Sequence, residues 1–226
     1  MNRELGIAVG VCLAGAILLL VLLAVAGRRR VHRHRVELHQ WAAANGWTLV
    51  AKPVVDWGSR LPGGDKHGVS LALHGEVGGR ACSVGEYSFS ETTTISTPGG
   101  HGATTITTHQ YVVVVLHLDR PSAYLGVQTL GVLSRWGHTL FGIGSSIGHE
   151  QFDEQFRVVG DPPAAAYPLS PELVAAHVEG TVPPWTLYGA DLMTWYPGRV
   201  DPARIPELIG PLQQVATLLT GADAAR

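Results

Sequence analysis

The sequence YVVVVL at residues 111–116 is an unbroken apolar run in this chain of 226 residues. Most of its residues are β-branched, and no polar residue alternates with them. This pattern is typical of a strand that is covered on both faces of a sheet. The run therefore predicts a central strand, with other strands paired along both of its edges.

Alternation and turn residues around this run predict further strands. Four consecutive segments have strand character: 69–77, 80–90, 91–96 and 104–118. Gly78-Gly79 separates the first two and is a tight-turn signal. The Pro- and Gly-rich stretch 97–103 separates the last two and predicts a flexible tip. We expect an antiparallel meander, in which residues 91–108 form a Thr-rich hairpin.

Helices are predicted after the sheet. Ser170-Pro171 and Asp201-Pro202 each place a capping side chain before a proline that can occupy the first helical position. The second of these helices is the C-terminal one. Segments 185–188 and 192–196 flank a Gly-Ala-Asp turn and predict another hairpin. The sequence thus predicts an α+β domain with an antiparallel sheet and flanking helices, because no repeated βαβ spacing occurs.

The N-terminal segment has a different composition. Residues 5–27 contain no charged side chain, and about 20 apolar residues suffice for a helix to cross a bilayer. A cleaved signal peptide is the competing interpretation, but Glu4 neutralises Arg3, and arginines occupy the place of the cleavage site. We therefore predict an uncleaved transmembrane helix.

A basic block follows this apolar run. Its arginines are Arg28, Arg29, Arg30, Arg33 and Arg35. Positively charged flanks remain on the cytoplasmic side of a membrane and contact anionic lipid headgroups. The expected location is the plasma membrane, in a single-pass topology with the N-terminus outside and the C-terminal domain in the cytoplasm.

These signals divide the chain into five parts. We expect an extracytoplasmic N-terminus (1–4), a transmembrane helix (5–27), a basic juxtamembrane segment and helix (28–46), a soluble α+β domain (47–221) and a disordered tail (222–226).

The charge balance limits the partners of the domain. Residues 1–35 hold six arginines and one glutamate, which leaves ten basic and seventeen acidic residues, or a charge of about −7, for the remainder. An acidic domain is a poor partner for nucleic acid. Cys82 is the single cysteine after the apolar run, so no disulfide is expected within the domain.

One short motif suggests catalysis. The sequence GSSIG at residues 144–148 matches the G-x-S-x-G pattern of serine hydrolases. In that interpretation Ser146 is the nucleophile, Asp153 or Asp161 is the acid and His177 is the base. The chemistry requires a buried parallel strand before the serine, which the sequence does not predict. A membrane-anchored serine hydrolase is therefore the alternative hypothesis.

Metal and cofactor signals are weak. The eleven histidines are scattered, without an i, i+4 pair that brackets a glutamate and without a cysteine–histidine cluster. The glycines of residues 142–148 lack the spacing of a phosphate-binding loop. We predict neither a metal site nor a bound cofactor.

Several short motifs resemble a group of uncharacterised single-pass membrane proteins of actinobacteria. They are WAAANGW at 41–47, ETTT at 91–94 with TTH at 107–109, FDEQFRV at 152–158, and Trp195 with GRVDP at 198–202. The resemblance implies an N-terminal anchor and a small cytoplasmic domain, and it assigns no activity.

The leading functional hypothesis is a non-enzymatic domain that binds a protein or a small molecule at the cytoplasmic face of the membrane. The Thr-rich hairpin at residues 91–108 is its predicted binding surface, because the arms of a hairpin can offer an edge for strand addition.

Overall fold

The computed structural model describes residues 2–61, 63, 66–96, 102–132, 144–161 and 169–224. Side chains are described for these residues except at 2–17, 66, 95–96, 102–103 and 221–224. The chain divides into two units, Met1–Asn45 and Gly46–Arg226.

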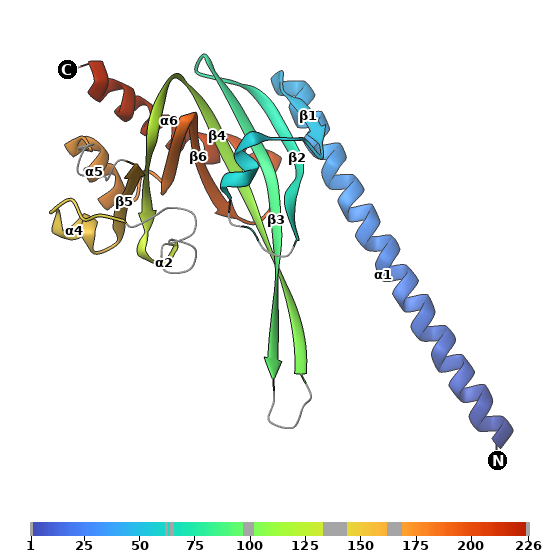
Figure 1. Cartoon of the computed structure of the whole chain (residues 1–226). Coiled ribbons are helices and arrows are strands. Elements are labelled where there is room, and N and C mark those ends of the chain that lie inside the picture. The colour runs from blue at the N-terminus through green and yellow to red at the C-terminus, as the bar shows by residue number, and fades with distance from the viewer. Residues whose placement is uncertain are drawn as a thin grey trace. The chain divides into compact units, whose positions relative to one another are not determined.

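The first unit is a single long helix, α1 (Asn2–Asn45) (Figure 1). It ends where the sequence predicts, because the Asn45 side chain donates to the Trp41 carbonyl at 2.8 Å and Gly46 takes a positive φ of 72°. Among the residues whose side chains are described, no helix is both long and apolar enough to cross a membrane. The predicted span at residues 5–27 begins in the part of α1 whose side chains lie outside that description.

The second unit is built on one antiparallel sheet (Figure 1). Its strands are β1 (Thr48–Ala51), β2 (Lys66–Val77), β3 (Arg80–Ser96), β4 (Gly102–Thr129), β5 (Phe156–Asp161) and β6 (Trp185–Pro197). The strands follow the order β1-β2-β3-β4-β5, and β6 also pairs with β4. The predicted α+β class with an antiparallel sheet is confirmed.

The run at residues 111–116 lies in the centre of this sheet, as predicted. Its β4 backbone pairs with β3 on one edge and with β6 on the other. Val113 and Val115 face a cluster that contains Trp57 and Leu61, from the short helix η1 (Asp56–Arg60) and the residue after it.

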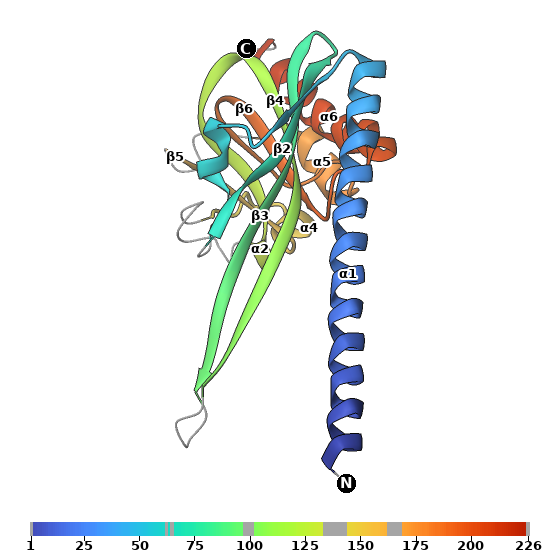
Figure 2. The ribbon, with the colours of Figure 1, turned by 90° about the vertical axis from the view of Figure 1, so that its right-hand side faces the viewer.

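The opposite face of the sheet is covered by the C-terminal helix α6 (Ile205–Ala224), which contacts β4 and β6 (Figure 2). The Tyr196 hydroxyl of β6 donates to the Leu208 carbonyl of α6 at 3.3 Å. Apolar side chains are therefore required on both faces of the central strand, which explains why its sequence does not alternate.

The predicted hairpin at 185–188 and 192–196 is wrong, because both segments belong to β6. β4 rises from its hairpin, bends, and returns toward α2 (Leu130–Val132) (Figure 1). Its register with β6 shifts between His117 and Ser122 and again before Leu125. β6 bends with it and stays paired along both halves of β4, with Gly189 at a positive φ of 59°.

The segments 80–90 and 91–96 likewise form one strand, β3, instead of the two that were expected. The first predicted hairpin is present, and its turn residues Gly78 and Gly79 have φ values of 59° and 77°. The second is present as well, with β3 and β4 paired as far as Ser96 opposite Gly102.

The remaining helices are short, and the predicted caps are confirmed. They are α4 (Glu150–Asp153), α5 (Pro171–Val178) and η4 (Pro202–Arg204), which leads into α6. The Ser170 hydroxyl accepts from the Leu173 amide at 3.2 Å, and the Asp201 carboxylate accepts from the Ala203 amide at 3.0 Å. α6 continues past Gly221 to Ala224.

The packing of η1 on the sheet predicts the effect of Gly85→Ala. A Cβ at this position would lie 2.8 Å from Trp57 Cη2 and 3.4 Å from the Leu71 carbonyl oxygen. We expect the free energy of unfolding to fall by about 1–3 kcal/mol, as for other overpacked cores. Urea denaturation measures this change.

Gly68→Ala is the matched control for Gly85→Ala. It also lies in a strand, but a Cβ there meets no heavy atom within 4 Å. The proposed packing would be contradicted if both alanine variants unfolded at the same urea concentration.

Candidate functional site

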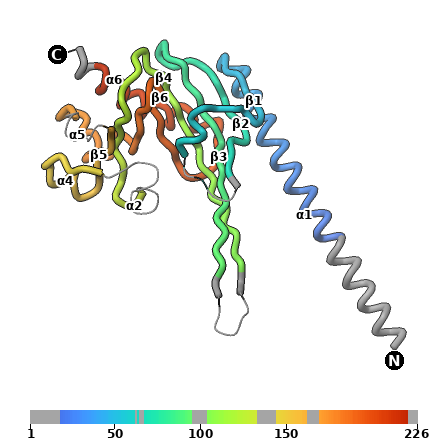
Figure 3. The backbone as a smooth tube through the Cα atoms, in the orientation of Figure 1, coloured from blue at the N-terminus to red at the C-terminus, as the bar shows by residue number. Residues whose placement is uncertain are grey.

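The hairpin between β3 and β4 extends beyond the body of the sheet as a two-stranded ribbon (Figures 1 and 3). We call residues 91–96 and 102–108 the Thr-rich ribbon. Pairing of β2 with β3 ends at Lys66 opposite Ser90, and pairing of β6 with β4 ends at Pro197 opposite Tyr111. Among the described residues, the outer edges of the ribbon therefore have no neighbouring strand.

The ribbon is exposed on both faces. The side chains described at 91–94 and 104–108 are all exposed, and that of Ile106 is 67% exposed. A two-stranded hairpin without a packed face is only marginally stable in water. The β-branched threonines favour the extended backbone, but they bury little apolar surface here.

Contacts at the base of the ribbon hold it to the sheet. The Phe89 ring stacks on the His109 ring at 4.8 Å and lies parallel to the Tyr111 ring at 6.0 Å. The hydroxyls of Ser90 and Thr108 are 3.0 Å apart. The ribbon thus starts from an ordered aromatic base that belongs to the core.

The edges of the ribbon lack the features that usually prevent strand pairing. Edge strands in soluble proteins are commonly protected by lysine, proline or inward-pointing charges. The described part of the ribbon contains one charged residue, Glu91, whose Oε2 lies 3.3 Å from His109 Nε2. The edges can therefore accept a further strand.

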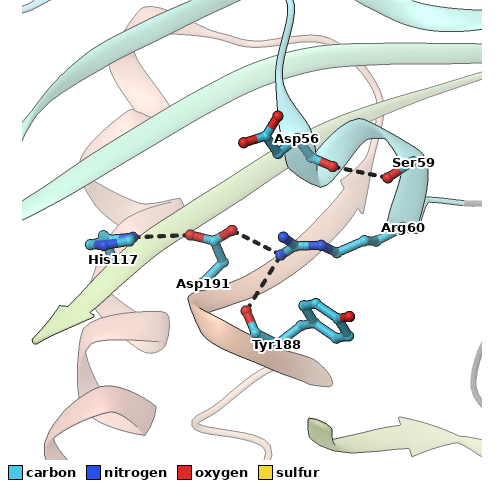
Figure 4. A network of polar contacts seen from close by, with 6 residues as sticks. All are labelled: Asp56, Ser59, Arg60, His117, Tyr188 and Asp191. Carbon is cyan, nitrogen blue, oxygen red and sulfur yellow. Dashed lines mark hydrogen bonds and ion pairs between the residues drawn. The ribbon is translucent and has the colours of Figure 1, made fainter. Parts of the chain in front are cut away.

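A second polar cluster lies at the bend of β4 and β6 (Figure 4). Asp191 bridges two partners, because one carboxylate oxygen accepts from Arg60 Nη1 at 2.8 Å and the other is 3.0 Å from His117 Nδ1. The Arg60 guanidinium lies 4.5 Å from the centre of the Tyr188 ring and 3.5 Å from the Tyr188 carbonyl.

This cluster connects η1 to the sheet. The Ser59 hydroxyl, which lies beside Arg60, donates to the Asp56 carbonyl of its own turn at 2.9 Å. Part-exposed ion pairs of this kind contribute about 1 kcal/mol or less. Sequence reasoning missed the cluster because its residues meet only through the unpredicted pairing of β6 with β4.

The residues of the hydrolase hypothesis differ in their exposure to solvent. Ser146 is exposed, next to the bridge between Ser145 and Val158, and Asp161 is exposed at the end of β5. The Asp153 carboxylate accepts from the Ile147 and Gly148 amides at 3.0 and 2.9 Å, so it shapes this loop. Residues 142 and 143 of the glycine-containing segment 142–148 lie outside the described residues.

His177, the predicted base, is 1% exposed in the core. Its Nε2 accepts the indole N–H of Trp185 at 3.0 Å, and its ring packs on Phe152 and Phe156. Burial lowers the pKa of His177 to about 4. The described residues give no hydrogen bond between His177 and Ser146, so the triad remains a prediction without geometric support.

Among the described residues, no three His, Cys, Asp or Glu side chains could hold a metal ion together. Cys82 is buried and unpaired, and burial raises the pKa of its thiol to about 12. The thiol is therefore protonated at neutral pH and unreactive.

The burial of His177 predicts acid destabilisation. Its pKa falls from 6.5 to about 4 on folding, so the unfolded chain binds more protons between these values. The free energy of unfolding should fall by about 3 kcal/mol as the pH drops through this window, at 1.36 kcal/mol per pKa unit. His177→Gln keeps an acceptor for the Trp185 indole and should flatten this part of the pH profile.

Denaturant titrations between pH 4 and pH 7 measure this effect. His67→Gln, at an exposed position of β2, is the control and should keep the wild-type pH dependence. A wild-type profile in His177→Gln would show that another group governs acid stability.

Comparison with known proteins gives one structural match. No protein-family model and no curated protein sequence matches the chain. The crystal structure of the mycobacterial trehalose monomycolate transport factor A, TtfA, matches with a TM-score of 0.47 and 12% sequence identity. The match covers 80% of this chain and 91% of TtfA. No residue role follows from a similarity at this level.

Proposed function

We propose that this protein is a membrane-anchored, non-enzymatic binding domain that docks a protein partner by strand addition at the Thr-rich ribbon. The observation that carries the proposal is the extension of β3 and β4 beyond the ends of β2 and β6. Unpaired strand edges recognise an extended segment through main-chain hydrogen bonds.

The ribbon suits an extended partner segment better than it suits a folded partner. Its exposed threonines offer hydroxyls and methyl groups on both faces, and cross-strand pairs of threonine are favourable. A third strand would satisfy backbone groups that water satisfies now, and it would bury the exposed Ile106 side chain in part. Binding would therefore stabilise a ribbon that is marginal alone.

The anchor is the second part of the proposal. Its support is the uncharged run at residues 5–27, the continuous helix α1 and the large apolar side chains exposed at Leu18–Leu23. The arginine block would then contact anionic headgroups. At 1.5 Å per residue, the helical segment 28–45 would extend about 27 Å from the end of the run, which suits a spacer.

The ribbon proposal predicts where a partner contacts the chain in cells. A photoreactive p-benzoylphenylalanine in place of Ile106 should form a discrete crosslinked product. Thr105→Lys and Thr107→Lys, added to that variant, should remove the product, because lysine on an edge strand opposes pairing. Both threonines are exposed, so the fold should persist, which circular dichroism can verify.

The same photoreactive residue at Glu207 is the matched control. The Glu207 side chain is 72% exposed on α6, away from the proposed edge. Equal crosslinking at positions 106 and 207, or a product that survives both lysine substitutions, would refute the strand-addition proposal.

The topology is tested by cysteine labelling. Thr94→Cys places a thiol on the exposed ribbon of a chain in which Cys12 is replaced by serine. Native Cys82 gives little background because it is buried and protonated. An impermeant maleimide should label position 94 only after the cells are permeabilised. Asn2→Cys should be labelled in intact cells, and labelling of Thr94→Cys in intact cells would overturn the cytoplasmic assignment.

A further inference from the structure

The two halves of the bent strand β4 line one cavity. Tyr111, near the start of the strand, and Gln128, near its end, both contribute to a space of about 440 Å³. Trp195 and Pro197 of β6 lie along the first half, and Pro184 precedes the part of β6 that pairs with the second half. The cavity thus follows from the bend, and its size lies within the range of small-molecule sites.

The walls of the cavity have a definite chemistry. Aromatic rings from Tyr111 and Trp195 and the rings of Pro184 and Pro197 supply most of its named side chains, and Val132 also belongs to the lining. No charged side chain belongs to its described lining. Flat rings favour a ligand that is itself planar and mainly apolar, through stacking and edge-to-face contacts.

One residue of the lining, Gln128, is polar and buried, and one of its polar atoms has no partner among the described residues. Gln128 is fully buried, and its Nε2 donates to the Trp185 carbonyl at 3.1 Å. Its Oε1 has no hydrogen-bond partner among the described residues. Because the amide is fixed by the bond to Trp185, this oxygen remains an acceptor, and a buried acceptor without a partner is unfavourable.

We propose that this cavity binds a small planar aromatic ligand whose N–H or O–H group donates a hydrogen bond to Gln128 Oε1. The proposal is independent of strand addition, since the cavity and the Thr-rich ribbon share no residue. The competing explanation is a buried water molecule, which could also donate to Gln128.

Indole and 1-methylindole separate these explanations, because they have almost the same shape and only indole carries an N–H donor. Each is titrated into the full chain in detergent micelles, and the glutamine side-chain amide resonances are followed by nuclear magnetic resonance. We expect indole to bind roughly tenfold more tightly, as expected when an acceptor loses its partner. The signal of Gln128 is identified by its loss in Gln128→Met.

Two variants complete the test. Gln128→Met removes the acceptor at similar size and should reduce the indole preference to near unity. Val132→Trp adds a large side chain to the lining without removing a side-chain hydrogen bond, and it should weaken both ligands by at least roughly tenfold. Partitioning of each ligand into protein-free micelles is measured separately, and free ligand concentrations are used in these comparisons.

The outcomes decide the proposal even if Gln128→Met fails to fold, because the two ligands are also compared in the wild-type chain. Equal binding of indole and 1-methylindole there would overturn the assigned role of Gln128. Absence of any resonance change at millimolar ligand would leave a bound water as the explanation and would refute the site.

Discussion

The structure depends on satisfying both backbone edges of β4. Val112–Leu116 are buried on both faces of the sheet, so water cannot reach their amide and carbonyl groups, and each must pair within the protein. β3 supplies one edge as far as Leu116, and β5 takes over that edge from Tyr124. β6 supplies the other edge along both halves of the strand.

The bend of β4 creates the local chemistry of the domain. At the bend, Asp191 lies directly opposite His117 and also binds Arg60, which ties η1 to the sheet. The same bend brings Tyr111 and Gln128, from the two halves of β4, to one cavity. The cavity could not arise from a straight β4, because Tyr111 and Gln128 are 17 positions apart on the strand and would lie far from each other.

Local signals in the sequence were sufficient for much of this fold. The apolar run at 111–116, the Gly78-Gly79 turn and the caps at Ser170 and Asp201 each act through neighbouring residues, and each was predicted correctly. The Gly-Ala-Asp stretch at 189–191 was misinterpreted because pairing with a distant strand overrides its turn preference.

The candidate sites also differ in whether their residues are neighbours in the sequence. The Thr-rich hairpin is continuous in sequence, so its composition and its turn predicted it. The cavity could not be predicted, since its lining extends from Tyr111 to Pro197 and meets only in the folded chain. His177, the base in the alternative hydrolase hypothesis, accepts a hydrogen bond from the Trp185 indole in the core, a contact that sequence alone could not predict.

The two edges of the Thr-rich ribbon are not equivalent. The β3 edge carries Glu91, whereas residues 104–108 of the β4 edge carry no charge. β6 turns away from β4 at Gly198, whose φ is 116° and whose amide donates to the Gln110 carbonyl at 2.9 Å. A partner strand that pairs with residues 104–108 of β4 would lie beyond the end of β6 on the same edge. It would not displace β6. The β4 edge is therefore the better template for a partner strand. Both edges of β4 are paired in the core, and the outer edge of the same strand is open at residues 104–108.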